Sequence, residues 1–375
     1  MRGGVVITHP SGLGDPGGGT VGCIRIANQM KRLGADVRVL AVSRGSVVPI
    51  EEVEVPVEST RPSRLHYLLD GRPLAARLQV VVRESNCRSV VGWTHEMAFA
   101  VPALRRMGVG IAMIAAFPGY GQWRRRATSL PRIRWAIDEF FRFGPLRNAD
   151  LVFALSEFTK RELIDILEVR PEKVVRVYWG VEDAFFEIPR KQPSKISNVI
   201  FFGAFTPQKG VLDAIRALGL LRRGSNTDWS LRIAGWGDQG PVLDLARSEQ
   251  IEENVAFLGR LDHLRLAEQL EWAHVGLLPS HVESFGLSIA EAQAAALPVV
   301  AFRAGSVPEV VVDGRTGFLA ELGDVEGLCG ALATLMASPS RSYAMGLEAR
   351  QRMARMFRWE STAREMLNAM DRLGR

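Results

Sequence analysis

Short runs rich in β-branched and other apolar residues alternate with amphipathic helical patterns along almost the whole chain. This alternation limits the possible folds more than any other feature. In the first half the predicted strands are Val5–Thr8, Asp36–Val42, Ser89–Trp93, Gly110–Ala116 and Leu151–Leu155. Strands that alternate with helices build βαβ units, in which neighbouring strands run parallel. We therefore expect an α/β fold with a doubly wound parallel sheet, whose first helix spans Val21–Leu33.

The alternation stops once, over residues 187–198, where the sequence is polar, rich in proline and aperiodic, as is typical of a linker. Beyond it the predicted strands are Val199–Phe202, Trp229–Ala234, Val255–Phe257, Val275–Leu278 and Pro298–Ala301. The predicted helices are Val211–Arg222, Val242–Gln250, Leu264–Trp272, Phe285–Ala296, Val325–Ala337 and a continuous tail helix over Ser340–Leu373. The sequence thus predicts two α/β domains, 1–187 and 188–355, each large enough for its own core.

Composition excludes several other classes of protein. The 375 residues are 47% hydrophobic and 23% charged, which argues against disorder and against a coiled-coil rod. No stretch approaches the ~18 apolar residues of a membrane span, and the N-terminus does not read as a signal peptide, so a cytoplasmic protein is expected. Three scattered cysteines, with no Asp-x-Asp and no His-x-x-x-His pattern, predict no disulfide framework, no metal site and no cofactor.

A glycine-rich loop, residues 11–20, joins the first predicted strand to the first helix. Glycines let a backbone approach a ligand closely, and a helix start presents unpaired N–H groups to an anion. Gly12, Gly14 and Gly17 match G-x-G-x-x-G, but the second strand ends at Arg44 and not at the acidic residue that an NAD site requires. Arg44 suits a 2′-phosphate, so an NADP-dependent oxidoreductase stays a minor alternative, beside a loop without any ligand.

Lys209 lies at the end of the segment that connects the predicted strand Val199–Phe202 to the next predicted helix. A cation at a helix start is disfavoured by the helix dipole unless an anion joins it. The chain has only six lysines, so the position of this one predicts a phosphate partner, with an ordinary solvated lysine as the alternative.

The stretch 277–291 runs from a buried strand, through a loop that holds Glu283, into an alanine-rich helix. Ser284 is the predicted N-cap, which leaves the amides of Phe285–Leu287 to bind a ligand phosphate. Glu291 follows two turns into that helix, where a carboxylate can accept hydrogen bonds from sugar hydroxyls. Two ordinary surface glutamates would be unusual between segments this apolar.

His95 follows the strand Ser89–Trp93, at the edge where open α/β sheets bind ligands, and a functional and a structural role are both open for it. His9, after the first strand, is a weaker candidate. Residues 123–147 interleave five aromatic residues with seven arginines. This mixture suits an anionic membrane surface, or a helix whose aromatic residues enter the core. Nucleic-acid binding is not predicted, because no recognised module accompanies the patch.

Together these residues resemble the retaining GT-B glycosyltransferases of family four. The resemblance is strongest over Val199–Ala320 and weaker over the first half. Its motifs are Gly203-x5-Lys209-Gly210, Arg232–Gly237, Val255–Arg260, Glu283-x7-Glu291, Pro308–Val310 and Asp313–Gly317, with the glycine-rich loop, His95, Ala154–Glu157 and Tyr178–Glu182 in the first half.

The resemblance implies two Rossmann-like domains that face a cleft, a donor bound mainly by the second domain, and a helix over 356–375 that crosses back to the first. The residues implied in donor binding are Gly18 and Gly19 of the first domain, with Lys209, Gly259, Arg260, Glu283, Phe285, Gly286, Leu287 and Glu291 of the second. Lys209 and the amides of Phe285–Leu287 would contact the diphosphate, Glu291 the ribose, and Gly259 with Arg260 the base.

Glu283 would lie beside the transferred sugar, and His95 would reach in from the first domain, so these two and Lys209 are the implied catalytic residues. Two positions depart from the family pattern. Ala204 stands where arginine is common, which removes part of the usual diphosphate clamp, and Ser306 stands where glycine is common.

The expected function is transfer of a hexose from a UDP- or GDP-linked sugar to a hydroxyl of a glycan, lipid-linked or small-molecule acceptor, with retention and without a metal. A nucleotide-sugar-binding protein without transferase activity is the alternative that Ala204 favours. The basic aromatic segment 123–147 leaves open a peripheral position on the inner membrane face.

Overall fold

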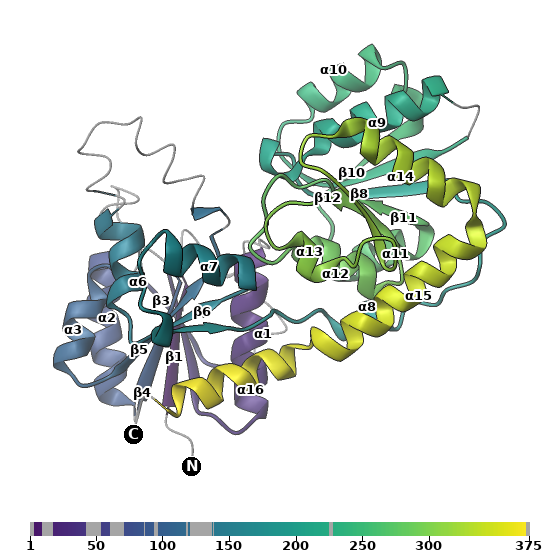
Figure 1. Cartoon of the computed structure of the whole chain (residues 1–375). Helices are drawn as coiled ribbons and strands as arrows, with labels where there is room; N and C mark the ends of the chain where they lie inside the picture. Colours follow the sequence, from purple (N-terminus) through teal and green to yellow (C-terminus); the bar gives the residue numbers. More distant parts are fainter. Residues whose placement is uncertain are drawn as a thin grey trace. The chain divides into compact units, whose positions relative to one another are not determined.

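The computed structural model describes residues 4–9, 18–42, 54–60, 71–85, 87–93, 97–117, 119–120, 137, 139–224 and 228–372. The chain divides into two compact units. The first comprises residues 1–180 and 359–375, and the second residues 181–358 (Figure 1). The boundary expected after residue 187 therefore lies seven residues beyond the observed one.

The first unit is built on a seven-stranded parallel sheet in the order β3-β2-β1-β4-β5-β6-β7. Its strands are β1 (Gly4–His9), β2 (Val37–Val42), β3 (Val57–Thr60), β4 (Cys87–Gly92), β5 (Gly110–Ala115), β6 (Leu151–Ala154) and β7 (Val174–Arg176). Each of the five strands predicted from the first half is present, because apolar runs of this kind are buried on both faces of a parallel sheet. The edge strands β3 and β7 were not predicted.

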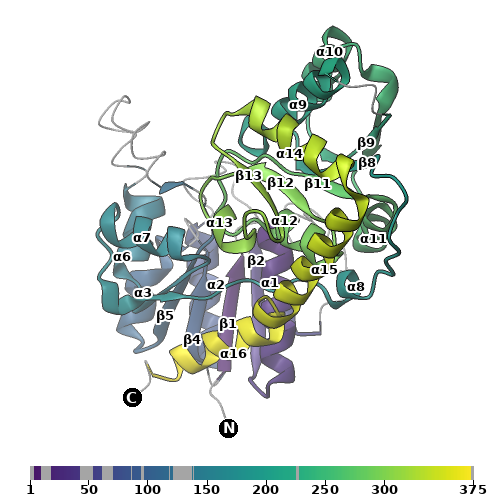
Figure 2. The same ribbon diagram turned by 45° about the vertical axis from the view of Figure 1, so that its right-hand side comes forward.

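Helices flank this sheet and close its core. They are α1 (Gly18–Arg32), α2 (Gly71–Glu84), α3 (Ala100–Arg106), α6 (Gly144–Asn148), α7 (Glu157–Asp165) and α16 (Trp359–Met370), with a π-helical turn η2 (Glu139–Phe143) before α6. The last helix of the chain, α16, packs along α1 (Figure 2). Trp179 and Trp359 pack with tilted rings near its start, with ring centroids 5.8 Å apart, so the helix α16 is part of the first unit's core.

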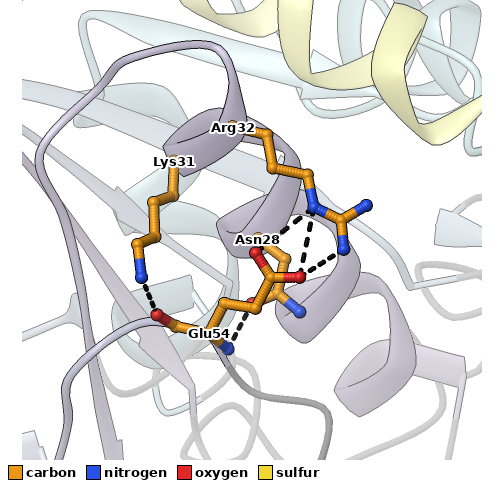
Figure 3. A network of polar contacts seen from close by, with 4 residues as sticks. All are labelled: Asn28, Lys31, Arg32 and Glu54. Carbon is orange, nitrogen blue, oxygen red and sulfur yellow. Dashed lines mark hydrogen bonds and ion pairs between the residues drawn. The ribbon is translucent and has the colours of Figure 1, made fainter.

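A polar network ties α1 to the chain that enters β3 (Figure 3). The buried Asn28 accepts a hydrogen bond from the Glu54 amide at 2.9 Å, and Lys31 donates to the Glu54 carbonyl. Arg32 pairs with the Glu54 carboxylate, which lowers the pKa of that carboxyl. One residue is thus held through its amide, its carbonyl and its side chain.

The second unit is built on a six-stranded parallel sheet in the order β10-β9-β8-β11-β12-β13. Its strands are β8 (Asn198–Ala204), β9 (Ser230–Trp236), β10 (Val255–Gly259), β11 (Val275–Leu277), β12 (Val299–Phe302) and β13 (Gly317–Ala320). Its helices are α8 (Asp183–Phe186), α9 (Val211–Gly224), α10 (Gly240–Ser248), α11 (His263–Trp272), α12 (Leu287–Ala294), α13 (Val307–Val310), α14 (Val325–Ala337) and α15 (Pro339–Met356). Figure 1 shows α9, α10 and α14 together on one side of this sheet, with α11, α12 and α13 on the other.

The polar segment 187–198 was predicted as a linker, but it belongs to the second unit and is anchored within it. The Arg190 guanidinium donates to the carbonyl oxygens of Leu270, Ala273 and Ala295, at 2.8 Å for Ala273 and 2.6 Å for Ala295. Burial lowers the pKa of Arg190 to about 10. A composition typical of a linker is compatible with this anchoring because one long arginine satisfies several helix-end and loop carbonyls.

The single tail helix predicted over 340–373 is wrong, because the structure has two helices, α15 and α16, separated at Phe357 and Arg358. Phe357 is fully buried and meets the Phe285 ring edge to face at 5.5 Å. Its carbonyl accepts the Val181 amide at 3.0 Å, a bond that an uninterrupted helix would not allow. The break is where the chain passes from the second unit back to the first.

Within the part of the chain that the structure describes, none of the helices combines the length and apolar composition that crossing a bilayer requires.

Candidate functional site

The topology of the second sheet identifies one place for a ligand site. The chain leaves β8 to build β9 and β10 on one side, and builds β11, β12 and β13 on the other. β8 and β11 are therefore the neighbours at which the strand order reverses, and α/β sheets bind ligands outside the carboxyl ends of such strands. The loops that follow β8 and β11 carry Lys209 and Glu283.

Lys209 ends the 3₁₀ turn η4 (Pro207–Lys209), and α9 begins two residues later at Val211, where the sequence predicted a helix start. The next residue, Gly210, adopts a left-handed conformation with φ 70°. A β-carbon there would overlap the Pro279 carbonyl oxygen, so glycine is what lets the two loops come together.

The Lys209 ammonium donates to Glu283 Oε1 at 2.6 Å. The Glu283 side chain is buried, whereas Lys209 keeps a third of its surface exposed. The Glu283 carbonyl oxygen accepts from the Ser306 amide at 3.1 Å and from the Ser306 hydroxyl at 3.2 Å. Ser306, which departs from the common glycine, therefore adds a contact that fixes the Glu283 backbone.

The start of α12 differs from the prediction. Gly286 is the N-cap, with φ 88°, and the helix begins at Leu287, two residues later than expected, so Ser284 is not the cap. The first intrahelical bond is donated by Ala290 to the Gly286 carbonyl. The amides of residues 287–289 precede that bond and form the helix's N-terminal turn, where an anion is favoured. Phe285 is buried against Phe357.

Glu291 lies inside α12 and is buried. The pKa of its carboxyl is raised to about 8, mainly by burial and then by the neighbouring charge of Glu182, while the Lys209 ammonium acts in the opposite direction. A carboxyl protonated near neutral pH, and coupled electrostatically to Lys209, is a strongly perturbed group in a candidate site.

A second pair lies at the same strand edge. β10 ends at Gly259, and the Arg260 guanidinium carbon lies 5.0 Å from the centroid of the Trp236 ring, at the end of β9. Trp236 is 43% exposed, unlike most large apolar side chains of this unit. Sequence reasoning assigned Gly259 and Arg260 but missed Trp236. Its signal was an aromatic residue between two glycines at a strand end, Gly235 and Gly237.

Ala204 ends β8 and pairs in register with Trp236 of β9. The position where arginine is common in the family thus lies at the same edge, between the Lys209 loop and the Trp236–Arg260 pair. Histidine, cysteine and acidic side chains nowhere form a group of three or more able to hold a metal ion in the described residues.

The first unit offers less evidence of a site. His95, Gly12, Gly14 and Gly17 fall outside the described residues. Gly18 and Gly19 begin α1, and a β-carbon at Gly19 would lie 3.7 Å from both His9 and Trp93. His9 ends β1, is buried, and meets Trp93 edge to face at 5.5 Å, which supports a packing role for it.

Of the basic aromatic segment 123–147, the structure describes residue 137 and residues 139–147. Phe143 enters the core, Phe141 packs on Phe99 at 5.7 Å, and Phe140 stays 51% exposed. Phe140 lines a pocket of about 690 Å³ beside α3 and α6, together with Val101, Arg105 and Pro145. The expected core packing is therefore found for Phe143, whereas contact of this segment with an anionic membrane stays a prediction.

Comparison with known proteins agrees with this geometry. Residues 183–353 match the family described as glycosyl transferases group 1, and residues 16–185 match glycosyltransferase family 4. The glycogen synthase of Mycobacterium tuberculosis is 31% identical over 220 residues, a match covering 58% of this chain and 53% of that protein. The chain is thus matched over about half the length of this relative.

Solved structures share the whole architecture. The sucrose-phosphate synthase of Thermosynechococcus elongatus superposes with a TM-score of 0.83 at 18% identity, covering 99% of each chain. Anabaena HepE, solved in complex with UDP-glucose, superposes with a TM-score of 0.79 at 20% identity and covers 99% of this chain and 100% of its own. The two parallel sheets with their flanking helices therefore define a GT-B fold. The chain belongs to the group 1 glycosyltransferases, in family 4.

Proposed function

We propose that the protein transfers a hexose from a nucleotide sugar to an acceptor hydroxyl, with the anomeric configuration retained. The observation that carries the proposal is the pairing of Lys209 with Glu283 at 2.6 Å, at the strand edge where β8 and β11 meet. Membership of the glycosyltransferase family supports it, as does the UDP-glucose bound by the HepE structure of the same fold.

The diphosphate of the donor competes with Glu283 for the Lys209 ammonium. A diphosphate carries more charge than one carboxylate, so Lys209 turns to the leaving group and stabilises the charge that develops on it as the sugar departs. The amides at the start of α12 act on the same charge. These amides are fixed by the helix and need no reorganisation during the reaction, which is the source of their effect on rate.

Glu283, once released by Lys209, accepts hydrogen bonds from the hydroxyls of the transferred sugar. The bond between the anomeric carbon and the phosphate oxygen breaks, and the acceptor oxygen bonds to that carbon from the same face. The acceptor proton passes to the departing phosphate oxygen, so no covalent sugar–enzyme intermediate is required. His95 of the first unit remains proposed as a further catalytic contact.

The other proposed donor contacts are to the ribose and the base. Glu291 holds the ribose hydroxyls, so Glu291→Ala raises the donor KM. Gly259 and Arg260 frame the base, and Gly18 and Gly19 complete the donor contacts from the first unit.

Calorimetric titration of UDP, GDP, ADP and NADP⁺ into wild type and Lys209→Ala tests the proposed donor site. Selective binding of one nucleoside diphosphate, weakened by the substitution, supports it and identifies the base. Binding of NADP⁺ alone supports the oxidoreductase alternative, and binding of none contradicts the site. A donor bound without release of free nucleotide, in the presence of candidate acceptors, marks a binding protein without transferase activity.

We also propose that the first unit contacts an anionic membrane through the segment 123–147. The exposed Phe140 beside Arg105 combines an apolar anchor with positive charge, as interfacial binding requires. Sedimentation with vesicles of zwitterionic lipid, with and without anionic lipid, tests this contact for wild type and Phe140→Ser. Leu264→Ser, on an exposed leucine of the second unit, is the control. Equal sedimentation of all three proteins contradicts the proposal.

A further inference from the structure

His281 lies in the loop after β11, and its side chain reaches α9, the helix that begins just after Lys209. His281 Nε2 lies 2.6 Å from Asp213 Oδ2. A carboxylate accepts hydrogen bonds, so Nε2 carries the proton of this contact. The two residues are 68 positions apart in the chain. Asp213 lies in the first turn of α9, four residues after Lys209, and His281 lies two residues before Glu283.

Asp213 is fixed from its other side. Its Oδ1 accepts from the Arg216 guanidinium at 2.7 Å, one turn along α9, and its amide donates to the Gly210 carbonyl at 3.0 Å. The Asp213 side chain is only 12% exposed, so it has little freedom to follow His281 if that ring moves. An acidic residue in the first turn of α9 is also favoured by the helix dipole.

His281 is fixed from its other side as well. Its ring meets Phe302 of β12 edge to face, with centroids 5.6 Å apart. Its backbone amide donates to the Gln208 carbonyl at 2.7 Å, next to Lys209. The imidazole therefore lies between a buried strand and the first turn of α9, while its own backbone is bonded to the turn that carries Lys209.

We propose that His281 and Asp213 form a clamp that positions Lys209 relative to Glu283 without touching the donor. This inference rests on the proposed function, because it assigns a role in the approach of Lys209 to the donor diphosphate. Besides the Lys209–Glu283 pair itself, three contacts join the loop after β8 and the start of α9 to the loop after β11. They are the clamp, the His281–Gln208 bond and the close approach of Gly210 to Pro279. Of these three, the clamp is the only one made by side chains, and so the one that substitution can remove alone.

The clamp acts on the diphosphate part of the donor and not on the base. Trp236 and Arg260 lie on β9 and at the end of β10, on strands that the clamp does not join. Loss of the clamp should therefore weaken the contact of Lys209 with the second phosphate and leave the binding of the base and ribose intact. A residue with only a general structural role would instead weaken all parts of the donor site together.

The experiment compares wild type with His281→Ala and His281→Gln. Glutamine presents an amide N–H at about the position of Nε2, so it can restore the contact with Asp213. Arg303→Ala is the control. It removes the ion pairs of Arg303 with Asp313 and Glu321, which lie in the same unit but do not connect the loop of Lys209 with the loop of Glu283. For each protein we measure the Kd of the nucleoside diphosphate that wild type binds, the Kd of its monophosphate, kcat for donor turnover and the thermal midpoint.

We expect His281→Ala to reduce the preference for diphosphate over monophosphate at least threefold and to lower kcat about tenfold. The Kd of the monophosphate should change less than twofold. His281→Gln should recover most of both losses, and Arg303→Ala should show neither. An unchanged preference, or equal weakening of both nucleotides in step with the thermal midpoint, overturns the clamp while leaving the proposed donor site intact. Failure of the wild type to bind any nucleoside diphosphate overturns the proposed function instead.

Discussion

Lys209 Nζ lies 2.6 Å from Glu283 Oε1, although the two residues are 74 positions apart and belong to different loops of the second unit. Glu283 is buried, so its charge needs a partner, and the Lys209 ammonium supplies one. The ion pair with Glu283 thus holds the Lys209 ammonium at the strand edge. A dianionic ligand can take over the lysine, and the carboxylate is then available for a polar sugar.

Lys209→Ala is expected to lower kcat for sugar transfer by about a hundredfold or more, because a fixed cation at the leaving group is lost. The donor KM should rise as well, since the ground-state diphosphate also contacts Lys209. Steady-state kinetics with the nucleotide sugar identified by calorimetry measures both parameters. Lys195→Ala, which removes an exposed pair with Asp228 in the same unit, is the matched control. Equal kcat values for the two variants would contradict the role of Lys209.

Glu291 predicts a pH dependence of stability. Its pKa is raised from 4.5 to about 8 in the folded chain by burial and by Glu182. Between these two values the folded state holds a proton that the unfolded state has released. Stability therefore falls as pH rises through that window, by at most about 1.4 kcal/mol per pH unit.

Glu291→Gln cannot ionise and should lack this contribution. The thermal midpoint of the variant relative to wild type is expected to increase steadily from pH 5 to pH 8, as measured by differential scanning calorimetry. Glu253→Gln, in the exposed turn Glu252–Asn254, should keep the wild-type dependence. A difference between Glu291→Gln and wild type that stays constant with pH would mean that Glu291 is ionised in the fold.

Trp236→Ala is expected to weaken binding of the nucleoside diphosphate by about 1–3 kcal/mol, or roughly 5- to 150-fold, if the exposed ring stacks on the base. The ring is 43% exposed and already has the Arg260 guanidinium at 5.0 Å. Inorganic pyrophosphate lacks a base, so its affinity should not change. Leu322→Ala, another exposed apolar residue of this unit, controls for loss of surface area. Equal losses for the nucleotide and for pyrophosphate would indicate damage to the loop and not loss of stacking.

The central strands of both sheets could be predicted because each is a continuous apolar run between helices. The strands β3, β7 and β13 were missed since a short strand at the edge of a sheet, such as Val57–Thr60, carries a mixed pattern. The break between α15 and α16 could not be predicted from the sequence either. The helical periodicity continues across residues 357 and 358, and only the burial of Phe357 against Phe285 explains why the helix ends there.

Within the candidate site, Lys209 and Glu283 could be found because each lies in a loop between a recognisable strand and the next helix, and Glu291 because it is a carboxylate inside an alanine-rich helix. The partners of Trp236 and His281 are distant in the chain, so the contacts that define their roles could not be predicted, although two flanking glycines mark Trp236 locally. The N-cap of α12 was misplaced for a related reason. Ser284 is the residue type that caps helices, but the left-handed conformation of Gly286 is set by the turn that brings Glu283 to Lys209.

Gly210 is expected to tolerate no side chain. Its φ of 70° costs any other residue about 1–2 kcal/mol, and a β-carbon would in addition overlap the Pro279 carbonyl. Gly314, with φ 74° and open space around its β-carbon position, isolates the first effect from the second. Gly314→Ala should therefore lower the thermal midpoint by only a few degrees and leave kcat unchanged. Gly210→Ala should lower the midpoint further and reduce kcat, because the loop that carries Lys209 must move away from Glu283. Thermal midpoints and kcat measured for both variants test this prediction. Equal thermal midpoints and equal kcat values for Gly210→Ala and Gly314→Ala would mean that the two loops can separate without loss of function.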